Sequence, residues 1–128
     1  VRIARGGEVI APGAATDKVQ WIDVRDLSRA CITFSEDARS GTVNAVCTPV
    51  GMGVLLDACI RGTQSNATLR WVDAATLEKF EVQPWSDMPV WIPSDAPMAG
   101  MSQSSNARAT AMGMEYRHID DTIAATWA

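Results

Sequence analysis

The stretch VQWIDVRDLSRA, residues 19–30, changes its hydrophobic period halfway along. Its first half alternates as a partly covered strand does, and its second half carries apolar residues at the three- and four-residue spacing of a helix. Asp23 stands at the change, where its carboxylate can accept hydrogen bonds from the free amides of a first helical turn. The stretch therefore predicts a strand that passes directly into an amphipathic helix.

This helix is expected to bury one apolar face and to turn its charged residues outward. The residues expected on the buried face are Val24, Leu27, Cys31 and Phe34, with Ala30 beside them. The residues expected on the outer face are Arg25, Asp26 and Arg29. Asp23 and Asp26 lie three residues apart and could form a carboxylate pair, but a helix cap plus one exposed acid explains them more simply.

The same patterns predict the other elements. The further strands expected are 8–13, 40–47 and 67–73, with a brief one at 90–92, and the helices expected are 48–62, 74–80, 105–113 and 118–128. Strands that alternate with helices favour an α/β fold with parallel pairing. Because the strands are few and none is a continuous apolar run, the chain is expected to form the edge and lid of such a protein rather than its centre.

The composition favours one globular domain, residues 1–128, with 47% hydrophobic and 20% charged residues. A net charge of −4 without a basic block disfavours nucleic-acid binding. No apolar run approaches the roughly 20 residues that cross a bilayer, so no membrane partner is expected. The cysteines, Cys31, Cys47 and Cys59, are odd in number and widely spaced, which predicts buried free thiols and a cytoplasmic location.

The chain begins with Val1 rather than Met, in a stretch, VRIARGG, that is typical of a helix tail ended by Gly6 or Gly7. A fragment of a longer protein and removal of an initiator residue both fit this start.

Four stretches, in order, resemble the C-terminal portion of extended short-chain dehydrogenase/reductases, the NAD-dependent epimerase/dehydratase group. They are GGEVIAPG, VQWIDVRDLSRA, SGTVNAVCTPVGMGVLLDACI and SNARATAMGMEYRHIDDTIAATWA, and together they cover nearly the whole chain. The resemblance implies the substrate-side portion of an NAD(P)-binding Rossmann-type protein, in which short strands alternate with helices. It also implies that a separate N-terminal domain, absent from this chain, binds NAD or NADP.

The resemblance further implies a Tyr-x-x-x-Lys motif that exchanges a proton while hydride moves to or from the nicotinamide. This chain lacks that motif, because its single tyrosine, Tyr116, is followed by Arg, His, Ile and Asp. It also lacks a complete Gly-rich turn: GMG at 51–53 opens a helix, but Leu56 stands where a third glycine would be. A helix-entry turn is the simpler interpretation of GMG. No catalytic, cofactor-binding or metal-binding residue is therefore expected in this chain alone.

The resemblance implies that the segment around Trp91 helps to cover the substrate, so Trp91, with Gln20 beside it, is the candidate for substrate contact. Trp91 lies in a long Pro-rich loop, 83–101, with Trp85 and the Met98–Met101 stretch, and such a loop can wall an apolar pocket. An equally good explanation is that these side chains pack against the missing domain or against one another. Val19 stands where nucleotide-sugar members of the family place an arginine that contacts phosphate, which disfavours a sugar-nucleotide substrate and favours a smaller or less charged one, or a different reductase branch.

The single histidine, His118, is interpreted as part of a helix start and not as a base or metal ligand. The leading hypothesis is a fragment that contributes the substrate pocket and lid of an NAD(P)-dependent epimerase, dehydratase or reductase. The expected partners are a small-molecule substrate, the missing dinucleotide-binding domain and a second copy in a homo-oligomer. Two alternatives stay open: a non-catalytic NAD(P)-sensing or partner-binding protein of the same fold, and an independent small α/β interaction domain.

Overall fold

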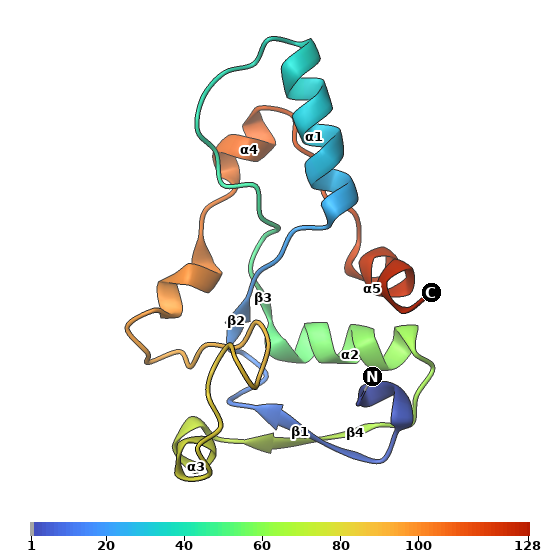
Figure 1. The fold of residues 1–128 in the computed structure, drawn as a ribbon, viewed down its shortest axis with the longest axis vertical. Helices are drawn as coiled ribbons and strands as arrows, with labels where there is room; N and C mark the ends of the chain where they lie inside the picture. The colour runs from blue at the N-terminus through green and yellow to red at the C-terminus, as the bar shows by residue number, and fades with distance from the viewer. Residues whose placement is uncertain (1) are drawn as a thin grey trace.

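A computed structural model describes residues 2–128, and it has a mixed α/β fold (Figure 1). The helices are α1 (Val24–Glu36), α2 (Met52–Gly62), α3 (Ala74–Lys79), α4 (Ala107–Ala111) and α5 (Ile119–Trp127), with 3-10 turns η1 (Ile3–Arg5) and η2 (Ala99–Gln103). The strands are β1 (Glu8–Pro12), β2 (Lys18–Val19), β3 (Val50–Gly51) and β4 (Thr68–Val72). The predicted alternation of strands and helices is confirmed at this level.

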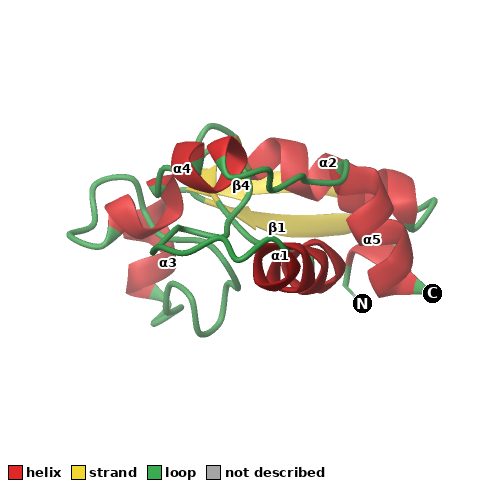
Figure 2. Cartoon of the chain, turned by 90° about the horizontal axis from the view of Figure 1, so that it is seen from above, coloured by secondary structure: helices red, strands yellow, loops and turns green. Residues whose placement is uncertain are grey.

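The longer strand pair is parallel, as predicted. β1 lies beside β4 with Glu8 opposite Thr68 and Pro12 opposite Val72, and the Gly13 N–H continues the ladder by donating to the Val72 carbonyl at 2.8 Å. β2 and β3 form a separate antiparallel pair of two residues each. Both views place α2 alongside the β1–β4 pair (Figure 1 and Figure 2).

The strand predicted to lead directly into α1 is confirmed only at Val19, where β2 ends, and residues 20–23 are not in a strand. Two other predicted strands are wrong. Residues 40–47 have no ladder partner, and their link to the chain beside them is a bond from the Cys47 N–H to the Trp21 carbonyl at 2.8 Å. One backbone bond does not make a ladder. Residues 90–92 form a local turn, in which the Trp91 carbonyl accepts from the Trp85 N–H at 3.1 Å. A sequence pattern typical of a strand does not show whether a neighbouring strand is present, and neither of these segments has one.

α2 begins at Met52 and not at Thr48 as the sequence predicted. The reason is that β3 pairs with β2, with Val50 opposite Val19, which holds the residues of the expected first turn in extended conformation. The predicted end at Gly62 is confirmed. A Cβ on Gly62 would lie 2.6 Å from Cγ2 of Ile123, so this glycine lets α5 pack closely against the end of α2.

The helix caps predicted at Asp23 and Asp73 are confirmed, because each carboxylate accepts from an amide in the first turn of its helix. Near the N-terminus η1 ends at Gly6, whose φ of +72° allows the chain to reverse. The predicted helix tail includes Val1, which lies outside the described residues.

The buried face of α1 differs from the prediction. Asp26 is only 2% exposed and Ala30 is buried beside it, whereas Val24 is 70% exposed and Cys31 is exposed. The helix turns its Asp26 side toward the C-terminal segment because that segment carries the ion-pair partner of Asp26, as described below. The expected burial of the Cys31 thiol is therefore wrong.

The other two cysteines, Cys47 and Cys59, are half-buried and free. Desolvation by burial raises the pKa of both thiols, so they stay protonated near neutral pH. A protonated thiol in an apolar setting is a packing group and a poor nucleophile.

Two separate hydrophobic cores organise the molecule. The first, called the Trp91 core, consists of Val19, Met52, Leu77 and Trp91 with partly buried neighbours. The second, called the α1–α4 core, consists of Ala30, Ala109 and Met114. Figure 1 shows α1 and α4 at one end of the long axis and the β1–β4 pair with α3 at the other, with β2 and β3 between them.

Candidate functional site

The most promising site lies at the carboxyl ends of β1 and β4. The two strands are parallel and in register, so both end at the same edge, where Pro12 and Val72 are opposite each other. In open α/β sheets ligands bind outside the carboxyl ends of the strands. The segments that follow the two strands, a loop at 13–17 and helix α3, therefore surround the expected position of a ligand.

A cleft of about 430 Å³ lies between α3 and the loop at 82–96, and we call it the α3 cleft. Its lining residues are Ala74, Ala75, Glu78, Val82, Gln83, Pro84, Trp91, Pro93, Asp95 and Ala96. Apart from the polar side chains of Glu78, Gln83 and Asp95, the walls are apolar, which is the usual character of a small-molecule site.

α3 is fixed at the base of the cleft by its cap. The Asp73 carboxylate accepts from the Thr76 N–H at 2.8 Å and from the Thr76 hydroxyl at 2.9 Å. The Thr76 amide, more than any other group, lowers the pKa of Asp73. The cap thus stays ionised near neutral pH and holds the first turn of α3 directly after β4.

Trp91, a predicted substrate contact, is the anchored wall of this cleft. Its side chain is 1% exposed, and the indole N–H donates to Oδ2 of Asp17 at 2.9 Å. The same oxygen accepts from the Ala14 N–H at 3.1 Å. Gly13 has a φ of +63°, and a Cβ there would lie 2.6 Å from the indole nitrogen and would overlap the Asp17 carboxylate. The loop at 13–17 therefore sets the position of the indole ring.

Gln20, the other predicted contact, does not line the α3 cleft. Its amide nitrogen donates to the carbonyls of Cys47 at 2.8 Å and Ser104 at 2.7 Å, and its amide oxygen accepts from the Ser104 N–H at 3.0 Å. These bonds join three segments that are far apart in the sequence. The structure does not bring Gln20 and Trp91 into one pocket, and a substrate contact at Gln20 stays a prediction.

The GMG turn at 51–53 is occupied by the chain itself. The Met52 N–H donates to the Asp17 carbonyl at 2.8 Å and the Gly53 N–H donates to the Ala15 carbonyl at 3.0 Å. A Cβ on Gly51 would lie 2.6 Å from that Ala15 oxygen. The turn receives the loop at 13–17, so these two amides are not available to a pyrophosphate. The interpretation as a helix-entry turn is confirmed.

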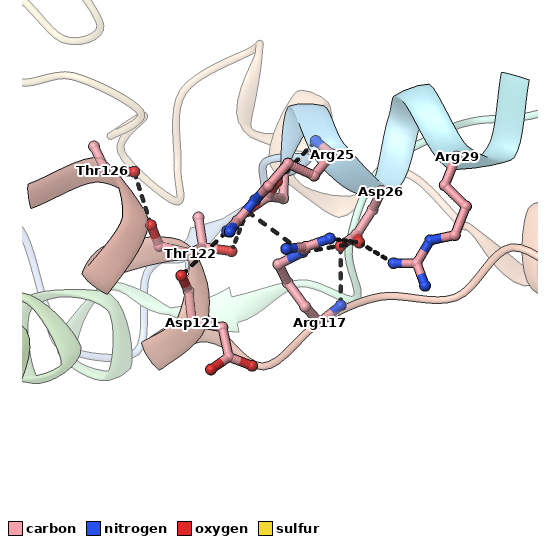
Figure 3. A network of polar contacts seen from close by, with 8 residues as sticks. Arg25, Asp26, Arg29, Arg117, Asp121, Thr122 and Thr126 are labelled. Atoms are coloured by element: carbon pink, nitrogen blue, oxygen red, sulfur yellow. Dashed lines mark hydrogen bonds and ion pairs between the residues drawn. The ribbon is translucent and has the colours of Figure 1, made fainter. Parts of the chain in front are cut away.

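Asp26 is a buried carboxylate that the sequence did not identify as such (Figure 3). Its Oδ1 accepts from the Arg117 guanidinium at 2.7 and 2.9 Å and from Arg29 at 2.6 Å, and its Oδ2 accepts from the Arg117 N–H at 2.9 Å. The Arg117 side chain, above all, lowers the pKa of Asp26. A carboxylate that is fully paired and held ionised does not exchange protons near neutral pH.

Asp23 extends this network to α5. Arg25 donates to it from its backbone N–H and from its guanidinium, at 2.7 to 2.9 Å, and the Thr122 hydroxyl donates at 2.8 Å. The pKa of Asp23 is lowered mainly by the Arg25 side chain. The two aspartates are thus a cap and a buried ion-pair member, and the exposed acid expected at Asp26 is wrong. Their spacing with Ala30, three and four residues, was the sequence signal for a shared buried face.

The remaining sequence candidates lie elsewhere. His118 caps α5, where its Nδ1 accepts from the Asp120 N–H at 3.4 Å, so its predicted place at a helix start is confirmed. Trp85, Met98 and Met101 are all exposed and none lines the α3 cleft.

Residues 2–128 offer neither a metal cluster nor a membrane-spanning helix. Across these residues, no group of three or more His, Cys, Asp or Glu side chains is placed to hold a metal ion. In the same part of the chain, no helix has both the length and the apolar character of a membrane span. Comparison of the chain with protein-family models, with curated proteins and with solved structures gave no match.

Proposed function

We propose that this chain is the C-terminal, substrate-side portion of an NAD(P)-dependent epimerase, dehydratase or reductase of the extended short-chain dehydrogenase/reductase type. The α3 cleft holds part of the substrate, and a companion dinucleotide-binding domain supplies NAD or NADP and the Tyr-x-x-x-Lys motif. The observation that carries the proposal is a parallel strand pair that has a cleft at its carboxyl ends, in a chain that exposes more surface than a compact protein of its mass.

The exposed surface of the chain supports a missing companion. A compact protein of 13.8 kDa is expected to expose about 6,600 Å². This chain exposes 7962 Å². The excess, about 1,300 Å² by that relation, is of the size that a partner domain covers.

The strand pair itself supports the same conclusion. Parallel strands are normally covered on both faces by other elements. Ile10 is 55% exposed and Trp71 is 36% exposed, and because Ala11 is opposite Trp71 these two side chains lie on opposite faces of the pair. The face of Ile10 therefore carries a large exposed apolar side chain, and the opposite face, where Val9 and Ala11 are buried, leaves Trp71 partly exposed.

β1 offers an attachment point for the companion. Among the described residues β1 and β4 pair only with each other, so each has one free edge. An apolar groove of about 450 Å³ runs beside β1, and its walls include Ile10, Leu55 and Leu56. A third strand beside β1 would fill this groove and pair with the part of the edge that is free, since the Glu8 carbonyl already accepts from the Arg2 guanidinium and Pro12 has no N–H.

Within this proposal the chain's own residues bind and shield the substrate and do not exchange protons with it. Trp91, a lining residue of the α3 cleft that is 1% exposed, is the first proposed substrate contact, and Gln20 is the second, from a different part of the surface. The free cysteines fit a cytoplasmic location, which is part of the proposal.

The coding sequence before Val1 provides the first test. The expected result is a Gly-rich turn followed by a Tyr-x-x-x-Lys motif. Upstream sequence without either motif would favour the NAD(P)-sensing or partner-binding alternative. A gene that starts at Val1 would contradict the proposal and favour an independent interaction domain.

The second test is biochemical. The 128-residue chain, titrated with NADH and NADPH and followed by nicotinamide fluorescence, is expected to show no micromolar binding. In the joined protein, Trp91→Phe is expected to raise KM, while Trp127→Phe, half-exposed on α5 and outside the cleft, leaves it unchanged. Micromolar binding by the isolated chain would contradict the proposal, and an unchanged KM would remove Trp91 from the site.

A further inference from the structure

We infer that the α3 cleft selects a substrate that carries a positively charged amine on an apolar body and discriminates against phosphorylated compounds. This inference rests on the proposed function, because it takes the α3 cleft as the substrate site. It goes beyond that function by naming the substrate class.

The lining of the cleft carries negative charge only. Glu78, from α3, and Asp95, from the facing loop, are its charged lining residues, and neither makes a salt bridge within the described residues. The walls between them are apolar, with Val82, Pro84 and Pro93. An amine can therefore meet unpaired carboxylates while its apolar body contacts these walls.

The wider surroundings of the cleft have the same sign. Residues 73–95 contain five acidic residues and one basic residue, a net charge of −4, which equals the net charge of the whole chain. The acidic residues are Asp73, Glu78, Glu81, Asp87 and Asp95, and the basic residue is Lys79. Clefts lined by one sign of charge concentrate ligands of the opposite sign and repel those of the same sign.

The buried side of the cleft adds a further carboxylate and no cation. Asp17 lies behind Trp91, bonded to its indole, and makes no salt bridge in the described part of the chain. Val19 is fully buried in the Trp91 core.

Phosphate recognition depends on Arg or Lys side chains or on free backbone amides. Helix α3, whose first residues Ala74 and Ala75 line the cleft, is capped by the Asp73 carboxylate, which adds a further negative charge at this helix start. The GMG turn has its Met52 and Gly53 amides occupied.

Three ligands with the same phenylethyl body and different charge test the inference. The probes are 2-phenylethylamine, 2-phenylethanol and 2-phenylethyl phosphate, and the phosphate carries about −1.5 to −2 at pH 7. Binding to the 128-residue chain is followed by the indole ¹H–¹⁵N resonances of the five tryptophans, with Trp91 identified by its loss in Trp91→Phe.

The amine is expected to shift the Trp91 resonance and to bind about fivefold more tightly than the alcohol, the effect of one exposed ion pair. The phosphate is expected to bind more weakly than the alcohol. Trp127, outside the cleft, is expected not to respond. Equal or tighter binding of the phosphate, or no response of Trp91 to any probe, would overturn the inference.

The matched variants separate cleft charge from net charge. Glu78→Gln with Asp95→Asn is expected to remove the fivefold preference, and both side chains are exposed, so the fold tolerates the change. Asp57→Asn, an exposed acid on α2 outside the cleft, is expected to keep it. A preference that survives the double variant would overturn the inference.

These titrations need no companion domain, so their outcome is independent of the upstream gene sequence. An amine preference without upstream motifs would remove the proposed function and keep the cleft selectivity. If the upstream motifs are present but the cleft binds the phosphate probe, the proposed function stands and the amine selectivity is overturned.

Discussion

The Trp91 core and the α1–α4 core are held together by different forces. The Trp91 core buries Trp91, Met52 and Val19, the largest fully buried side chains of the described chain. The α1–α4 core buries two alanines and Met114. The ion pairs of Asp26 with Arg117 and Arg29 lie beside the α1–α4 core. Asp17, the buried carboxylate beside the Trp91 core, makes no ion pair within the described residues.

This difference has a physical reason. Burial of apolar area stabilises in proportion to that area, and the fully buried side chains of the α1–α4 core are few and mostly small. Partly buried side chains pack against them: Ile22, Phe34, Val43, Ala45 and Tyr116. Asp26 and Arg117, 91 residues apart, add an ion pair that links α1 to the C-terminal segment. The end of the molecule that carries the α3 cleft is thus fixed by packing, and the opposite end by packing together with charge.

The largest predicted effect is in the Trp91 core. Trp91→Ala is expected to lower the free energy of unfolding by about 4 kcal/mol, because it leaves a cavity and removes the indole donor from Asp17. Urea denaturation followed by circular dichroism measures the change. Trp85→Ala, where the side chain is 53% exposed, is the control and should cost under about 1 kcal/mol. Similar losses in the two variants would mean that Trp91 is not the centre of this core.

The second prediction concerns the α1–α4 core. Asp26→Ala is expected to lower the free energy of unfolding by about 3 kcal/mol, because it leaves Arg117 partly buried without a counter-charge. The Arg117 amide, bonded to Asp26, should lose its hydrogen-exchange protection first. Asp57→Asn is the control for loss of a surface charge. Unchanged protection at Arg117 would show that apolar packing alone holds the C-terminal segment.

The third prediction concerns the loop that supports Trp91. Gly13→Ala is expected to cost about 2 kcal/mol, because φ is +63° and the new Cβ would meet Asp17 and the indole nitrogen. Gly100→Ala, where a Cβ meets nothing within 4 Å, is the matched control and should change stability by under about 0.5 kcal/mol. A tolerated alanine at position 13 would mean that the loop moves freely, and the anchoring of Trp91 would then fail as an explanation of the cleft.

The sequence predicted the features that depend on neighbouring residues and missed those that depend on residues far away in the chain. Caps at Asp23 and Asp73 and the end of α2 at Gly62 depend on residues within one helical turn, so local pattern was sufficient. The ion pair of Asp26 depends on Arg117, and the start of α2 at Met52 depends on the pairing of β3 with β2. Local spacing can indicate a shared helix face, but it does not identify such distant partners.

The site shows the same division. Trp91 could be chosen as a pocket residue because an aromatic residue in a long Pro-rich loop is a local signal. Its anchor, Asp17, is 74 residues away and had no signal of its own. Gln20 was chosen with Trp91 from the family resemblance, but its amide bonds to Cys47 and Ser104 depend on two remote segments.

The smallest effect is expected from lowering the pH, which should destabilise the α1–α4 core and leave the Trp91 core unchanged. The pKa values of Asp23 and Asp26 are held below the ordinary 3.8, chiefly by the side chains of Arg25 and Arg117 respectively. The unfolded chain therefore takes up protons first as the pH falls, so the stability from these pairs is complete above about pH 4 and declines below it. The loss should be smaller than in Asp26→Ala, because a protonated carboxyl still fills its place.

Resonances of the Arg117 amide and the Val19 amide, followed from pH 6 to pH 3, measure the two ends of the molecule in one experiment. Arg117 should change first and Val19, fully buried in the Trp91 core and paired with Val50, should keep its position, because none of the ion pairs found within the described residues involves that core. Asp26→Asn should weaken the pH dependence at Arg117, since a neutral side chain cannot titrate. Simultaneous loss of both resonances in the wild-type chain would mean that the two cores unfold as one unit and that charge and packing do not divide the molecule.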